Sequence, residues 1–523
     1  MADRAQPINA LTWAGRAASG LVLLLILGTL GAVALRAEAG RGLGPADWAA
    51  LRFTLLQATL SAALSLGLAI PLARALTRRA FPGRGLFIAL LGAPFILPVI
   101  VAIFGLLAIF GQQGWINSGL GFLGLGPIRI YGLHGVVLAH VFFNLPLATR
   151  MLLQGWAAIP GEQFRNAAAL GFAPADIQRH LEWPMLRAVA PGVALVVFAI
   201  CLTSFAVALT LGGGPRATTI ELAIYQAFQF EFDLGKAALL SMIQLGIAGA
   251  AALAAAALVP SAGFGAGLDM ASPALRPRGI GLRLVDAIVV TLAGAFLLGP
   301  LLSVVLSGLW QVAELPGLVW HAALRSVLVA LASVAITMVL ALSMALAASG
   351  AAAPGRRLVE VAGVLPIAAS PLVLGTGAFL VIFPVADPVA LALGVTALVN
   401  ALASLPFALR VLLPHARALA ADYGRLTQSL GMSAGAQLRW VVIPRLRRPL
   451  GFAAGLSGAL SVGDLGVIAL FANPERATLP LAMYQLMGAY RLDEAAGAAV
   501  LLLIACLALF WTFDFWGRRD VAA

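Results

Sequence analysis

Long apolar runs recur along the whole of this 523-residue chain and decide its fold class. A membrane-spanning helix needs about 20 consecutive apolar residues. With only 10% charged residues, the chain could not cover a soluble core, since soluble domains carry about a quarter. We therefore predict an all-α polytopic membrane protein of about twelve spans. The predicted spans are 17–35, 53–76, 86–110, 132–153, 188–211 and 237–259, then 284–309, 321–349, 359–383, 388–413, 448–471 and 495–516.

One polar stretch occurs twice, at residues 144–187 and again at 404–447. At an offset of 260, the two copies are identical at 14 of 44 positions. Each copy falls between the fourth and fifth predicted spans of its set. The repeat predicts two homologous six-helix halves, residues 1–260 and 284–523, joined by a linker at 261–283.

Each copy of the repeat reads as a short helix, a glycine that can stop it, a second short helix and a closing proline. Hydrophobic residues just before that proline are expected to give the second helix an apolar contact. One copy alone could be an amphipathic helix lying on the bilayer. Two copies in register favour a twofold docking surface for a twofold-symmetric partner.

The basic residues orient the chain, because they bias a loop toward the cytoplasm. With both termini inside, 24 of the 33 lysines and arginines fall on the cytoplasmic side. Both copies of the repeat are then cytoplasmic. This distribution explains the net charge of +12 better than nucleic-acid binding does. Arg4 and Arg16 before the first apolar run could also mark a signal peptide, but keeping this run gives two equal halves.

The glycine-to-proline frame of the repeat resembles the cytoplasmic coupling loop of ABC importer permeases. The usual Glu-Ala-Ala opening of that loop is replaced here by Arg165-Asn166-Ala167 and Arg425-Leu426-Thr427. Other stretches, such as 96–105, 140–146 and 212–226, look like thiamine importer permeases in particular. The resemblance places coupling loops at about 154–187 and 414–447. The residues it assigns to them are Arg165, Ala167, Gly171, Leu181, Trp183, Pro184, Arg425, Gly431, Val441, Ile443 and Pro444.

The resemblance implies the type I importer fold in the inner membrane and transport by alternating access. A separate ATPase dimer, which binds ATP-Mg, would dock on the cytoplasmic side, and a periplasmic solute-binding protein on the other. Lys236, the single lysine, lacks the glycines and Ser/Thr of a phosphate loop, so we expect no nucleotide cofactor in this chain. Thiamine or its phosphates are the implied cargo. Iron(III), polyamine and sulfate importers share the fold, so the cargo stays open.

Two other function classes fit less well. A secondary transporter often has six plus six helices. In major-facilitator proteins, however, the basic signature loop lies between the second and third helices of each half, whereas the repeated loop here lies between the fourth and fifth. A membrane enzyme would need intramembrane histidines or paired acids. The five histidines do not recur at metal-ligand spacing, so no metal site is expected.

Asp464 is the one acid clearly inside a predicted span, and an intramembrane carboxylate is a functional candidate by default. The alternative is a helix-capping Asp in a helix broken by Gly463 and Gly466. Gly212–Gly214 and Asn473-Pro474 follow the fifth and eleventh spans, and could begin half-helices or form tight turns. For a cationic cargo, the predicted pathway residues are Asp464, Phe205, Tyr225 and Tyr484.

Overall fold

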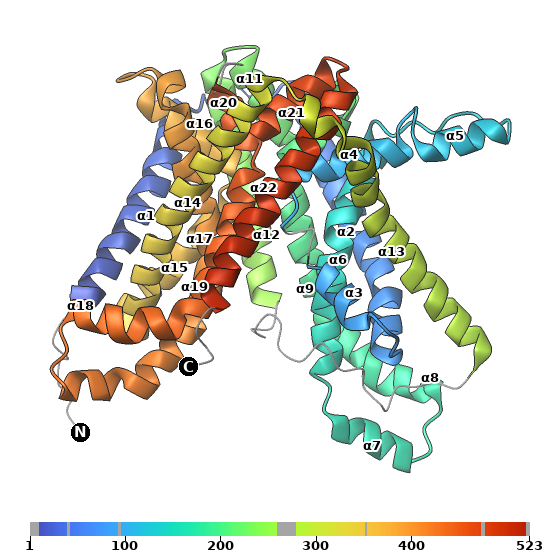
Figure 1. The fold of residues 1–523 in the computed structure, drawn as a ribbon, viewed down its shortest axis with the longest axis horizontal. Coiled ribbons are helices and arrows are strands. Elements are labelled where there is room, and N and C mark those ends of the chain that lie inside the picture. Colours follow the sequence, from blue (N-terminus) through green and yellow to red (C-terminus); the bar gives the residue numbers. More distant parts are fainter. Residues whose placement is uncertain are drawn as a thin grey trace.

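The computed structural model describes residues 10–38, 42–92, 96–258, 279–350, 353–471 and 476–518, and these are helical without any strand (Figure 1). The helices of the first half are α1 (Ala10–Arg36), α2 (Pro45–Arg78), α3 (Arg84–Leu90), α4 (Val99–Phe110), α5 (Trp115–Phe122), α6 (Leu133–Ala157), α7 (Gly161–Ala169), α8 (Pro174–Ile177), α9 (Trp183–Leu202), α10 (Phe205–Leu211), α11 (Ile220–Gln229) and α12 (Leu234–Leu258). Those of the second are α13 (Ile280–Gly308), α14 (Gly317–Gly350), α15 (Ala353–Ala368), α16 (Pro371–Ile382), α17 (Pro388–Ser429), α18 (Ala434–Gln437), α19 (Ile443–Val462), α20 (Gly466–Phe471), α21 (Leu479–Gly488) and α22 (Leu492–Arg518).

The predicted fold class is confirmed. Within the described residues, eleven helical stretches are long and apolar enough to cross a membrane, or twelve when one bent pair counts as a span. That pair, Arg356–Ile367 and Pro371–Ile382, turns by 98°. The third predicted span of the first half is likewise split, into α3 and α4. Most of the predicted linker, and Asn473-Pro474, lie outside the described residues.

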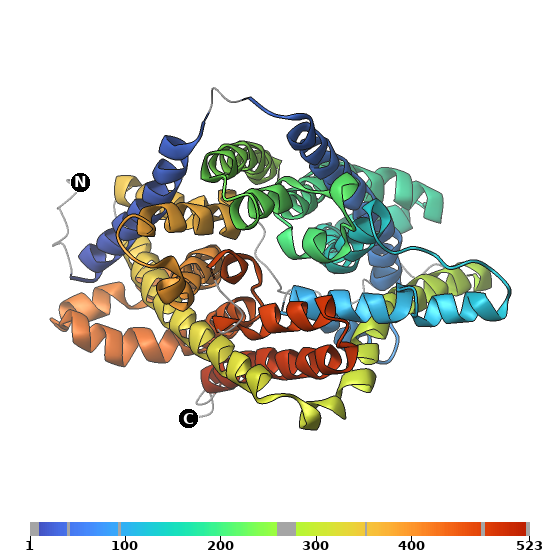
Figure 2. The ribbon, with the colours of Figure 1, turned by 90° about the horizontal axis from the view of Figure 1, so that it is seen from above.

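The first helix of each half packs against the other half. Helix α1 lies along α14, α15 and α16, whereas α13 lies along α2 and α4. Glycines allow the closest approaches. A Cβ on Gly15 would stand 2.2 Å from the Ser343 carbonyl oxygen, and one on Gly105 would stand 2.3 Å from that of Pro300. The two sequence halves are therefore interleaved in space, as the view from above shows (Figure 2).

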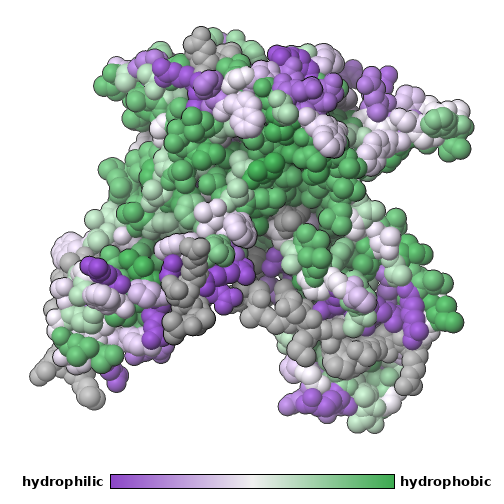
Figure 3. Space-filling view, in the orientation of Figure 1, coloured by the Kyte–Doolittle hydropathy of each residue, from purple (hydrophilic) through white to green (hydrophobic). Residues whose placement is uncertain are grey.

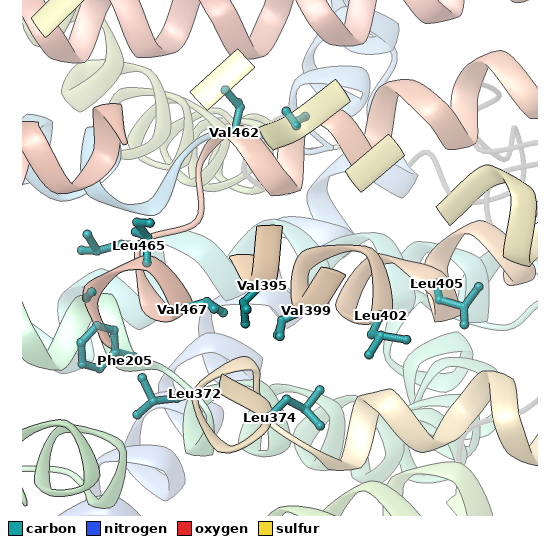
Figure 4. Packing of buried hydrophobic residues seen from close by; sticks show 14 of the residues in the cluster. Phe205, Leu372, Leu374, Val395, Val399, Leu402, Leu405, Val462, Leu465 and Val467 are labelled. Carbon is teal, nitrogen blue, oxygen red and sulfur yellow. The ribbon is translucent and has the colours of Figure 1, made fainter. Parts of the chain in front are cut away.

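The core lies where the halves meet. Phe205 of the first half is buried in one apolar cluster with Leu372, Leu465 and Val467 of the second (Figure 4). A second apolar cluster holds most of the first half together, with Phe142 fully buried in it.

The molecule has two distinct ends. Helices α7 and α8 in one lobe and α18 in the other lie at the same end, which we name the loop end, and α11, α20 and α21 lie at the opposite, far end (Figure 1). Hydrophobic residues form a belt between these ends, and a recess opens between two lobes at the loop end (Figure 3). The belt is the surface that the membrane requires, since lipid tails accept only apolar side chains.

Candidate functional site: paired loops and a broken-helix centre

The two repeated loops share one turn geometry. In the first, the Gly171 N–H donates to Ala168 (3.1 Å) and the Phe172 N–H to Ala167 (2.9 Å). The second copy repeats both bonds, from Gly431 to Gln428 (3.1 Å) and from Met432 to Thr427 (3.1 Å). This is the Schellman helix ending, which needs a left-handed residue. Gly171 and Gly431 supply it, with φ of +69° and +60°.

The loops differ from the predicted form in two ways. In the second copy the first short helix is not separate, because α17 continues from the span to Ser429. Pro184 and Pro444 do not close the unit, since each is the second residue of the next long helix. One π-helical turn, Gln178–Glu182 or Leu438–Val442, joins the second short helix to that long helix without a break. Proline has no N–H to give to the preceding turn, and a π-helical turn just before it accommodates that missing bond within the continuous helix.

The residue that anchors each loop is not one of those predicted. Trp183 and Ile443, expected to pack inward, are exposed, and Leu181 and Val441 are only partly buried. The residues between them are buried: Glu182 in the first loop and Val442 in the second. Leu181 and Val441 do pack against the apolar clusters, as predicted, so one residue of each predicted pair makes the expected contact and Trp183 and Ile443 do not.

Glu182 is held by an ion-pair network to α2. Its Oε2 lies 2.7 Å from Arg74 Nη2, and its Oε1 lies 3.8 Å from Arg78 Nη2. Arg74 also donates to Gln178 Oε1 at 2.8 Å. A charged group this deeply buried is costly unless it is paired. The first loop is thus locked to α2 by charge, whereas Val442 ties the second loop to the apolar core.

Exposed apolar residues project from the loops. Leu170 and Leu430, matched in the repeat, end the first loop helix in each copy and are 72% and 66% exposed. Arg165 and Arg425 are exposed, and Ala167 and its counterpart Thr427 are buried. A leucine at the tip of a helix end, with arginines around it, can enter a groove on a partner. Sequence reasoning missed the leucines, although their identity in both copies was a usable signal.

A second constellation lies where the fifth span of each half breaks. Between α9 and α10 the freed carbonyls are satisfied by side chains from neighbouring helices. Gln57 Nε2 donates to the Cys201 carbonyl (2.9 Å), and Gln244 Nε2 donates to that of Leu202 (2.7 Å). Non-helical backbone at membrane depth needs such partners. The matching break in the second half lies between α19 and α20, where Asn400 Nδ2 donates to Ser461 Oγ at 3.1 Å.

Asp464 occupies this second break, so the helix-capping interpretation is confirmed. Its Oδ1 and Oδ2 accept from the N–H groups of Gly466 and Val467, each at 3.3 Å, at the start of α20. The Asp464 side chain is largely but not fully buried, as is that of its first-half counterpart Ser204. A capping carboxylate that keeps some exposure can also meet a ligand.

The predicted aromatic residues gather at the same place. The rings of Phe205 and Tyr225 are 5.2 Å apart and edge to face. Phe205 also borders Gly466, beside Asp464. Tyr225 and Tyr484 stand in α11 and α21, outside the candidate spans. Burial raises the pKa of both phenols, and the nearness of Tyr484 adds to the shift at Tyr225. Asp464 and Phe205 therefore adjoin the break, Tyr225 contacts Phe205, and Tyr484 lies near Tyr225.

Known proteins similar along nearly the whole chain are permeases. The thiamine transport system permease protein ThiP of Salmonella typhimurium is 42% identical over 474 residues, 88% of each chain. Its namesake in Escherichia coli is 40% identical over 487 residues, 91% of this chain and 90% of that one. The namesake in Brucella abortus is 38% identical over 522 residues, 96% and 94% of the two chains. The chain belongs to the thiamine transport permease family.

Because the chain belongs to the thiamine transport permease family, its functional class is that of a transport permease. The secondary transporter and membrane enzyme alternatives are thereby excluded. A molybdenum transport permease, ModB of Azotobacter vinelandii, is 32% identical over 178 residues, 34% of this chain. No family model matches the chain. In the part of this chain that the structure describes, no three His, Cys, Asp or Glu residues form a group that could hold a metal ion.

Sequence reasoning also missed a second buried carboxylate. Glu221, in the first turn of α11, is 1% exposed, and its Oε1 accepts from Gln244 Nε2 at 3.2 Å. Because Gln244 also holds the Leu202 carbonyl, Glu221 orients the amide that supports the break. The GGGPRA segment before α11 forms a turn and a short 3-10 helix, and α11 itself is a half-helix.

Proposed function

We propose that this chain forms the membrane-spanning part of an ATP-driven importer for thiamine or its phosphates in the inner membrane. The observation that carries the proposal is the full-length similarity to permeases named for thiamine transport. The twofold pair of loops at one end and the polar break between the halves fit a transporter that opens alternately to two sides. Both chain ends then lie with the loops in the cytoplasm.

The proposed partner at the loop end is a dimer of a separate ATPase, which binds ATP-Mg. Leu170 and Leu430 offer it equivalent apolar contacts about a pseudo-twofold axis. Movement of a loop passes directly into α9 or α19, because the π-helical turns make loop and span one continuous helix. Helices α9 and α19 both end at the central breaks, so each of them connects a loop to the proposed cargo site. A periplasmic solute-binding protein would deliver cargo at the far end.

The proposed cargo site is the broken centre. Thiamine carries a cationic thiazolium ring, which the partly buried carboxylate of Asp464 and the aromatic faces of Phe205, Tyr225 and Tyr484 can receive. The direct test is uptake of labelled thiamine, thiamine phosphate and iron(III) by a strain from which this gene is deleted. Loss of thiamine or thiamine phosphate uptake alone, restored by the gene, supports the proposal. Loss of iron uptake alone would refute the cargo assignment but leave the permease class intact.

A further inference from the structure

Among the described helices, the one at the far end of the first half has substantial contact only with the helix before it. Helix α5 continues α4 sideways, beyond α13 (Figure 1, Figure 2). From Gln112 to Arg129 nearly every residue is exposed. The second half has no counterpart, because only Phe383–Asp387 connects α16 to α17. This segment is therefore an addition to the repeated six-helix plan.

The projecting segment exposes mainly large apolar side chains. Phe122, at the end of α5, is 94% exposed, and Leu123 is 74% exposed. Others that are more than a third exposed are Trp115, Ile116, Leu125 and Ile128. Contiguous apolar surface of this kind marks an interaction site and is unfavourable in water.

The segment is fixed in shape despite its exposure. Asn117 is buried and clamps the return of the chain onto α5. Its Nδ2 donates to the carbonyls of Gly111 (2.8 Å) and Ile128 (2.9 Å), and its Oδ1 accepts from the Ile128 N–H (2.7 Å). A preformed apolar projection needs no ordering when its partner covers it.

The composition and direction of the segment identify the partner. No charged residue or histidine occurs from Gly85 to Ile128, so no ionised side chain opposes contact with lipid. Trp115 and the amides of Gln112 and Gln113 suit the boundary between headgroups and acyl chains. The segment also points away from the junction of the halves, where a delivering protein would sit (Figure 2). We propose that α5 and the residues up to Ile128 lie in the outer leaflet of the bilayer and anchor the first half laterally.

The test compares lipid contact at three exposed positions in the full-length protein. Phe122→Cys, Leu24→Cys and Tyr490→Cys are each spin-labelled and reconstituted into phosphatidylethanolamine–phosphatidylglycerol vesicles. Leu24, 69% exposed in α1, reports hydrocarbon, and Tyr490, 89% exposed between α21 and α22, reports water. The native Cys201 and Cys506 are buried, and the labelled parent chain measures their background.

Collision rates with oxygen and with a water-soluble nickel complex distinguish the outcomes. The oxygen-to-nickel ratio at residue 122 should resemble that at residue 24 and exceed that at residue 490 several-fold. A ratio equal to that at residue 490 would overturn the proposal. So would nickel access at residue 122 that is lost only when a solute-binding protein is added, since this would make that protein the occupant. Leu125→Cys gives an independent second position.

Discussion

At the scale of single residues, Asp464 combines two tasks that substitution can separate. Its carboxylate caps α20, and it keeps some exposure near Phe205. A lost cap costs about 1 kcal/mol. The attraction of the carboxylate for a cation 4 Å away is about 4 kcal/mol at an effective dielectric of about 20, before desolvation is subtracted. The electrostatic task is therefore the larger of the two for a cationic cargo.

We expect Asp464→Asn to slow uptake of labelled thiamine roughly tenfold, which corresponds to about 1.4 kcal/mol. The amide oxygen can still cap α20, so thermal stability in detergent and basal ATP hydrolysis should hardly change. Asp464→Ala removes both tasks and should lower stability as well. The matched control is Ser204→Ala, because Ser204 makes no side-chain capping bond. Normal thiamine uptake by a well-expressed Asp464→Asn protein would remove Asp464 from the pathway.

Glu182→Gln should destabilise the protein by about 3 kcal/mol, the lower end for breaking a buried ion pair, because Arg74 is 23% exposed. The substitution leaves Arg78 buried beside a neutral amide. Thermal unfolding should shift down, and transport per ATP hydrolysed should fall as the first loop loosens from α2. Glu182→Asp keeps the charge and should recover much of the stability. A Glu182→Gln protein as stable as the parent would mean that side-chain length and hydrogen bonding, and not charge, hold the loop to α2.

At the scale of elements, the coupling loops depend on two backbone angles. A Cβ on Gly171 or Gly431 would meet nothing within 4 Å, so any effect of substitution comes from the positive φ alone. Alanine there should cost about 1–2 kcal/mol. Proline, whose φ is fixed near −65°, cannot form the turn.

Gly171→Pro and Gly431→Pro should therefore abolish transport and co-purification of the ATPase, while the protein still inserts. Gly171→Ala and Gly431→Ala should each partly reduce transport and co-purification of the ATPase. Gly435→Ala is the matched control, since Gly435 lies within α18, has no positive φ and has open space around it. Co-purification at the normal level with both proline variants would contradict the assignment of these loops as the ATPase contact.

The sequence predicted these elements unevenly, for physical reasons. Gly171 and Gly431 were found because glycine tolerates a left-handed turn that other residues resist. The break at Asp464 was an open alternative, since its flanking glycines allow a break without requiring one. The burial of Glu182 could not be predicted, because its partner Arg74 is 108 residues away in the sequence. Glu221 was missed because the polar turn before α11 made that segment look like an outer loop.

At the scale of the whole molecule, the sequence likewise could not show the long-range packing partners of α1 and α13. Hydropathy reports that a segment prefers lipid to water, and says nothing of which neighbour it packs against. The repeat predicts two halves as sequence units. It could not predict that α1 lies on the second half and α13 on the first. The exchange makes the chain one interlocked body, so relative movement of the halves must bend the spans at their central breaks.

An interlocked body predicts that the covalent linker is dispensable. If the chain is expressed as two polypeptides, cut between residues 259 and 278, the halves should still co-purify from the membrane and restore thiamine uptake. Tight crossings should hold them, and the closest of these on α1 is at Gly15. Gly15→Ala places a methyl group 2.2 Å from the Ser343 carbonyl and 2.3 Å from Ala347 Cβ, so the backbones must move apart.

The matched control is Gly28→Ala, in the same helix but with nothing within 4 Å. Both substitutions gain the same helix propensity, about 1 kcal/mol relative to glycine, so any difference between them reports the crossing. In the split protein, Gly15→Ala should reduce recovery of the second half on an affinity tag placed on the first, whereas Gly28→Ala should maintain it. If both variants co-purify equally well, α1 does not hold the halves together through this contact, and other close crossings, such as those at Gly105 and Gly377, carry the association.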